Sequence, residues 1–63
     1  MAATFELYKD KPVEFRWRLR HDNGNIIADS GECYTTKESA MNGIESVKNN
    51  APEALFYDES ILL

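Results

Sequence analysis

The clearest pattern along the chain is a strict alternation of apolar and polar residues over positions 14–20. The apolar positions are Phe15, Trp17 and Leu19, and charged side chains occupy the positions between them. A period of two residues is typical of a β-strand with one packed face and one face in water. A shorter pattern of the same kind at residues 5–8 predicts an earlier strand, separated from the second by a polar turn.

The sequence Asp22-Asn23-Gly24-Asn25 predicts a tight hairpin after the second strand. We place Asn23 and Gly24 at the centre of a type I′ turn, because both tolerate the positive φ that this turn requires. A third strand then covers about residues 25–30. The register pairs Leu19 with Ala28, Arg18 with Asp29 and His21 with Ile26. A slip of one residue would bury Ile27 instead.

A helix is predicted from Thr35 to about Asn50. Thr35 and Glu38 form a capping box, in which each side chain meets a free backbone N–H group. Apolar side chains then recur at helical spacing: Ala40, Met41, Ile44, Val47 and Ala51. Pro52 disfavours a helical conformation of the residue before it and so ends the helix. Gly43 lowers helix stability by roughly 1 kcal/mol relative to alanine, which indicates close packing against the helix there.

After the helix, residues 54–57 predict a short final strand and residues 58–63 a tail. The order of elements is then three strands, one helix and one strand. This is an α+β fold, a β3-α-β unit in which one helix packs on one face of an antiparallel sheet. No internal repeat or linker interrupts the sequence, so we predict a single domain over residues 1–63 with its core at about 4–57.

The composition favours self-association. A chain of 63 residues buries only about 60% of its unfolded surface, and such small domains usually need a disulfide, a metal or an oligomer interface. One cysteine, Cys33, and one histidine, His21, allow neither an intrachain disulfide nor a common zinc site. A homodimer is therefore expected, since the final strand needs a partner once the helix covers the sheet. The residues singled out for packing or dimer contacts are Gly43, Ile44, Leu55 and Tyr57.

The net charge of −4 disfavours nucleic acid as a general partner. One local feature points the other way, because Arg16, Arg18 and Arg20 share one face of the second strand at a spacing of about 6.6–7 Å. That row predicts, as an alternative function, a weak binding surface for nucleic acid or an anionic ligand. The simpler interpretation, which we favour, is a solvated face whose arginines pair with neighbouring carboxylates.

Catalytic chemistry is not indicated. His21 and Cys33 are the candidates for a base and a nucleophile, and the predicted register puts them near opposite ends of the hairpin region. The carboxylates form no cluster of metal-ligand type, and no glycine-rich phosphate motif is present. We therefore predict no enzyme, no cofactor and no metal. The apolar runs are too short to span a membrane, and the first residues lack signal-peptide features, so a cytoplasmic protein is expected.

Four blocks of the sequence carry a family resemblance: residues 5–10, 15–19, 23–28 and 42–48. Single positions add to it: Ser30, Tyr34, Lys37, Ala40, Asn50 and Ala51. Over residues 4–57 the chain resembles the YegP-like family of small uncharacterised bacterial proteins. It departs from the usual pattern at Pro12-Val13, at Cys33 and at residues 61–63.

The resemblance implies that the β3-α-β unit occurs as a tandem repeat or as a pair of subunits. Two units would share one sheet, with the last strand crossing to the partner unit. Since this sequence holds one copy, the resemblance implies a homodimer. It implies no activity, cofactor or catalytic residue. Taken together, the sequence predicts a small homodimeric structural or interaction module of unknown ligand, without catalytic activity.

Overall fold

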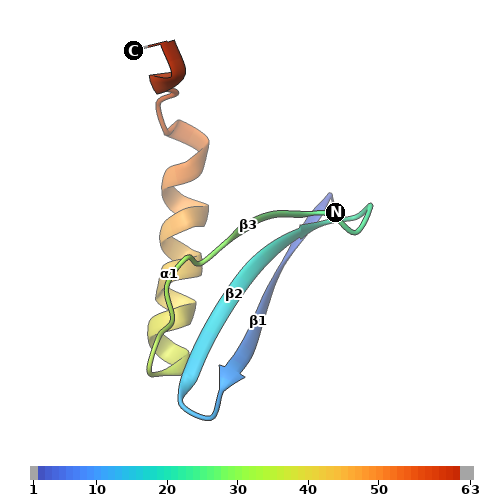
Figure 1. Ribbon diagram of the computed structural model, residues 1–63, viewed down its shortest axis with the longest axis vertical. Helices are drawn as coiled ribbons and strands as arrows, with labels where there is room; N and C mark the ends of the chain where they lie inside the picture. Colours follow the sequence, from blue (N-terminus) through green and yellow to red (C-terminus); the bar gives the residue numbers. More distant parts are fainter. Residues whose placement is uncertain (1, 62–63) are drawn as a thin grey trace.

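The computed structural model describes residues 2–61 as a three-stranded antiparallel sheet with one helix. The elements are β1 (Ala3–Lys11), β2 (Glu14–His21), β3 (Ile26–Asp29), α1 (Lys37–Asn50) and two 3₁₀ turns, η1 (Ala51–Glu53) and η2 (Glu59–Ile61). The strand order is β1-β2-β3, so β1 and β3 are the two edges. In Figure 1 the helix lies beside the sheet near the turn between β1 and β2, and the two diverge toward the other end. The α+β class predicted from the sequence is confirmed.

The core is centred on β2. The alternation predicted there is confirmed, because Trp17 is only 5% exposed. Phe5 of β1 meets the Trp17 ring edge-on, with ring centroids 5.7 Å apart. From α1, Ala40 is fully buried. Among the described residues, Trp17 and Ala40 are the two buried hydrophobic residues, so the core is small.

The hairpin between β2 and β3 forms where it was predicted but with another turn. The N–H of Gly24 donates to the carbonyl of His21 at 2.8 Å, and of the two predicted central residues only Gly24 has positive φ, at +95°. Type I′ is therefore wrong. The side-chain oxygen of Asn23 instead accepts from the N–H of Asn25 at 2.9 Å, which reverses the chain without a left-handed residue at Asn23.

This turn shifts the register by one residue at its base. Leu19 still lies opposite Ala28, and Arg18 opposite Asp29, as predicted. The partner of Ile26 is Arg20 rather than His21, because the strand pairing is irregular after Leu19. All four residues of β3 are exposed, so neither Ile26 nor Ile27 is buried in the single chain.

The N-cap of the helix lies one residue later than predicted. Thr36, not Thr35, is the N-cap, and its hydroxyl oxygen accepts from the N–H of Ser39 at 3.1 Å. Two adjacent threonines offer the same chemistry, and sequence spacing alone does not choose between them. The end at Asn50 is as predicted, with Pro52 in the 3₁₀ turn that follows.

Gly43 marks the closest approach of the helix to the sheet side. A Cβ atom at this position would lie 2.6 Å from the hydroxyl oxygen of Tyr34 and 3.1 Å from Nε1 of Trp17. Tyr34 is held in place by two backbone hydrogen bonds with Phe15, of 2.7 and 2.8 Å. The helix can pack at this distance because residue 43 has no side chain.

The final strand predicted at residues 54–57 is absent from the single chain. Ala54 has extended backbone angles, but no ladder partner for this segment lies among residues 2–61. A strand is defined by hydrogen bonds to a neighbour, and the chain leaves the helix pointing away from the sheet (Figure 1). Of the predicted tail, Leu62 and Leu63 lie outside the described residues.

We expect Gly43→Ala to lower the free energy of unfolding by about 1 kcal/mol or more, because the new methyl group overpacks the contact with Tyr34. Alanine would otherwise raise helix stability by about 1 kcal/mol. Urea denaturation at a fixed protein concentration measures the change. Combining Gly43→Ala with Tyr34→Phe, which removes the clashing hydroxyl, should recover part of the loss.

The exposed neighbour supplies the control for that experiment. Asn42→Ala places the same methyl group on the open side of the helix and should leave stability equal or higher. If Gly43→Ala unfolds at a higher urea concentration than the parent, the close contact at Gly43 is not tight.

Candidate functional site

The three arginines of β2 are each paired with a carboxylate of β1. The Nε atom of Arg16 lies 3.0 Å from Asp10, and those of Arg18 and Arg20 lie 2.6 and 3.1 Å from the same Glu6 oxygen. The antiparallel register places Glu6 directly opposite Arg18, so the pairing follows from the sheet itself. The arginine row predicted as an alternative polyanion surface is thus partly neutralised within the chain.

Further contacts hold this arginine face in place. Arg20 also donates from Nη1 to the carbonyl of Gly24 at 2.9 Å, and the Arg18 guanidinium lies 4.5 Å from the centre of the Tyr8 ring. Hydrogen bonds from Arg18 and then Arg20 lower the pKa of Glu6 below its ordinary value. The same bond to Glu6 raises the pKa of Arg18.

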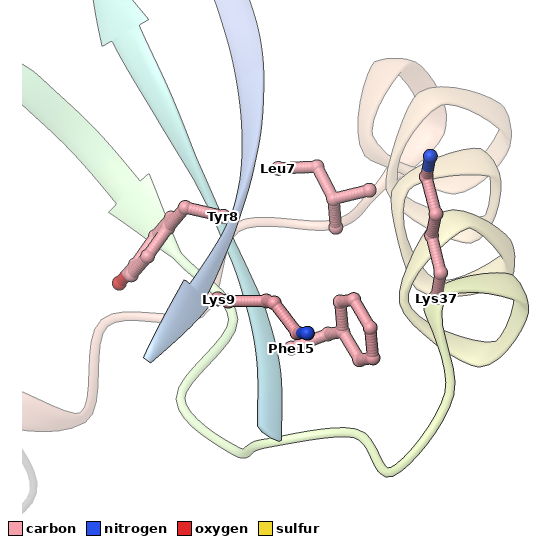
Figure 2. Close-up of a pocket in the computed structure, with 5 residues that line it drawn as sticks. All are labelled: Leu7, Tyr8, Lys9, Phe15 and Lys37. Carbon is pink, nitrogen blue, oxygen red and sulfur yellow. The ribbon is translucent and has the colours of Figure 1, made fainter. Parts of the chain in front are cut away.

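A groove of about 210 Å³ lies on the other face, where β1 meets the start of α1. Figure 2 shows Leu7, Phe15 and Lys37 around this space, while Tyr8 points to the opposite side of the sheet. Lys9 lines the groove as well, with its Nζ atom 5.5 Å from the centre of the Phe15 ring. The groove therefore has an apolar floor and two ammonium groups at its rim.

The two lysines of this groove differ from the arginines in their surroundings. Within residues 2–61, neither Lys9 nor Lys37 forms an ion pair, whereas Lys48 lies 3.9 Å from Glu45. A second, wider groove of about 580 Å³ opens at the far end of the helix, between Phe5, Leu19 and Lys48. It has one lysine, already beside a carboxylate. The unbalanced positive charge thus belongs to the first groove.

The sequence pattern does not predict the groove between β1 and α1. The alternation of Leu7 and Lys9 with a period of two residues does place both on the face of β1 that carries Phe5. Their meeting with Lys37 depends on how the helix docks, and that is set by the contact at Gly43. The spacing of residues along the chain carries no such information.

The predicted catalytic candidates do not meet. The residue after Cys33 pairs with Phe15 near the start of β2, and His21 ends the same strand, about 20 Å away at 3.3 Å per residue. The Nδ1 atom of His21 accepts from the N–H of Asn23 at 3.2 Å, and Cys33 is an exposed free thiol. The part of the chain that the structure describes holds no group of three or more potential metal ligands. Between residues 2 and 61, no helix has the length and apolar character needed to cross a membrane.

Known proteins match this chain both in sequence and in fold. Residues 10–58 match the family described as a domain of unknown function (DUF1508). The chain belongs to this family. The solution structure of a protein from Haloferax volcanii superposes with a TM-score of 0.82 at 57% identity, covering 89% of this chain and 93% of that one. The fold of this chain, three strands and one helix, therefore resembles that of a solved structure with 57% sequence identity.

Relatives in the DUF1508 family occur at two lengths. A UPF0339 protein of Treponema denticola is 54% identical over 54 residues, which is 86% of this chain and 91% of that protein. The UPF0339 protein YegP of Escherichia coli is 44% identical over 59 residues, 94% of this chain but only 53% of YegP. The chain thus spans about half the length of YegP. The predicted resemblance to the YegP-like family is confirmed.

The names of these relatives state no activity and no ligand, in keeping with a family of unknown function. A relative from Methanosarcina acetivorans is 50% identical over 52 residues, and the Haloferax protein comes from another archaeon. The description of the family as bacterial is therefore too narrow.

The Glu6 pairs generate a prediction about acid stability. Because the pKa of Glu6 is lowered in the folded chain, its contribution to stability is present above the ordinary value of 4.5 and is lost as the pH falls below it. We expect Glu6→Gln to reduce stability at neutral pH and to flatten the decline between pH 4.5 and the acid range. Urea unfolding as a function of pH measures both.

Glu45→Gln is the matched control, since Glu45 is exposed and lies at 3.9 Å from its lysine. Its acid decline should follow the parent. An unchanged pH dependence in Glu6→Gln would contradict a structural role of the arginine pairs.

Proposed function

We propose that this chain acts as a homodimer that serves as a non-catalytic interaction module. The observation that carries the proposal is the apolar segment after the helix. Leu55, Phe56 and Tyr57 are 96%, 90% and 69% exposed in the single chain. Three consecutive large apolar residues in water are unusual for a monomer and typical of an interface.

The thin core supports the same proposal. Only Trp17 and Ala40 are buried among residues 2–61, and the apolar helix residues Ile44 and Val47 are partly exposed. A domain of this size gains little free energy from such a core, and a partner surface is the usual remedy. Among residues 2–61, neither edge of the sheet has a neighbouring strand, which leaves a place for an added strand.

The two lengths of DUF1508 relatives support a unit that works in pairs. YegP has about twice the length that this chain covers, which suits two units in one polypeptide. A chain with one unit would reach the same arrangement by pairing with a second copy. In that dimer the segment at residues 54–57 would cross to a sheet edge of the partner and become the strand that the single chain lacks.

Other functions have weaker support. A polyanion surface at Arg16, Arg18 and Arg20 would act against a net charge of −4 and against carboxylates already bound to all three arginines. Catalysis lacks a paired base and nucleophile within the described residues, as His21 and Cys33 lie apart. The exposed free thiol of Cys33 supports the cytoplasmic location inferred from the sequence.

Light scattering at micromolar concentration tests the dimer directly. We expect a mass of twice 7.2 kDa for the parent chain. The double variant Leu55→Ser, Phe56→Ser should dissociate, because it removes the apolar area that the partner would cover. Val13→Ser, which changes an exposed apolar residue in the turn between β1 and β2, is the control and should remain dimeric. A parent mass of 7.2 kDa throughout this range would overturn the proposal.

A further inference from the structure

The groove between β1 and α1 combines an apolar floor with positive charge at its rim. The half-buried side chains of Leu7 and Phe15 form the floor, and the exposed side chains of Lys9 and Lys37 stand at the rim on different elements (Figure 2). Neither lysine forms an ion pair among residues 2–61. The groove therefore presents charge that the described part of the chain does not neutralise.

The sheet explains why Lys9 has no carboxylate beside it. Asp10, the next residue, lies on the arginine face and accepts a hydrogen bond from Nε of Arg16 at 3.0 Å. The Nζ atom of Lys9 lies 5.5 Å from the centre of the Phe15 ring instead. This contact orients the ammonium group over the floor without cancelling its charge, so the group can still bind an anion.

The charge at the rim selects a small anion as the occupant. A cation would meet two ammonium groups, and a long polyanion would also meet the net charge of −4 of the whole chain. A small anion in the groove interacts mainly with Lys9 and Lys37, because exposed charges farther away than about 8 Å are largely screened at physiological salt.

The floor and the volume define the rest of the occupant. Sites for drug-sized ligands usually have volumes of about 300–1,000 Å³, and this groove encloses about 210 Å³. It therefore has room for one ring or a short alkyl chain, which would cover Leu7 and Phe15. A singly charged carboxylate loses less hydration energy beside an apolar floor than a doubly charged phosphate group does. The anionic group that fits best is thus a carboxylate.

We propose that the groove between β1 and α1 binds a small organic acid, in which a carboxylate is attached to one ring or a short alkyl chain. The carboxylate accepts hydrogen bonds from the ammonium groups of Lys9 and Lys37, and the apolar part lies on Leu7 and Phe15. This ligand site goes beyond the interaction module proposed above, and it needs no second copy of the chain.

Titration of the isotope-labelled chain with phenylacetate, followed by its amide resonances, tests the site. We expect saturable shifts around the groove, at Leu7, Lys9, Phe15 and Lys37, with a dissociation constant of about 1 mM for a ligand of this size. Phenylacetamide has the same ring without the charge, and acetate has the charge without the ring. Each should bind at least about tenfold more weakly than phenylacetate.

Substitution of single lysines separates the site from a general attraction of anions. Lys9→Gln and Lys37→Gln each remove one charge from an exposed side chain, and we expect either to raise the dissociation constant of phenylacetate at least about fivefold. Lys48→Gln is the matched control, because it removes the same charge from an exposed lysine at the other end of α1 and should bind like the parent. The dispersion of the amide resonances shows that each variant is folded.

Four results would overturn the inference. The first is a set of shifts that does not saturate by about 20 mM phenylacetate, or that gathers at Phe5 and Leu19 in the wider groove. The second is equal affinity for phenylacetamide, and the third is tighter binding of inorganic phosphate than of phenylacetate. The fourth is an equal loss of affinity in Lys48→Gln and in the two groove variants. Light scattering on the same samples gives the oligomeric state, so failure of the ligand site and failure of the homodimer are separate results.

Discussion

The packing of Trp17 against the helix at Gly43 is the contact on which the rest of the structure depends. Trp17 is the large buried side chain of the described core, with Phe5 at its edge and the helix at Gly43 close to its indole nitrogen. Its indole N–H is buried without a hydrogen-bond partner in the described chain, and such a group lowers stability. The contact must offset that loss by close packing, which explains why a glycine, otherwise unfavourable in a helix, stands at position 43.

A core this small holds the helix to the sheet mainly around Trp17, Ala40 and Gly43. Toward the start of α1 the groove with Lys9 and Lys37 remains, and toward its end the wider groove beside Phe5 and Leu19 opens. Beyond that end, Leu55, Phe56 and Tyr57 are exposed. The grooves and the uncovered segment are thus consequences of the same geometry.

The parts of this fold that the sequence predicts correctly are those that local chemistry decides. The alternation around Trp17 determines β2, and Pro52 determines where the helix ends. The predicted N-cap was wrong because Thr35 and Thr36 can cap the helix in the same way. The predicted type I′ turn was wrong because the Asn23 side chain accepts a hydrogen bond from Asn25 and reverses the chain without positive φ at Asn23. The final strand predicted at residues 54–57 does not form, because no ladder partner for this segment lies among residues 2–61. The groove was missed because it arises from helix docking, which no spacing reveals.

The distribution of charge separates the two faces of the sheet by role. On one face, Arg18 and Arg20 both pair with Glu6 of the neighbouring strand. The register of β1 and β2 produces these pairs, and the charges are balanced within the sheet. On the other, Lys9 and Lys37 line one groove from different elements, and neither forms an ion pair among residues 2–61. Ion pairs that complete themselves within a sheet stabilise the strands that carry them, and they leave little charge for a partner. Among the described residues, unbalanced positive charge therefore lies beside the apolar floor of the groove rather than along the arginine row.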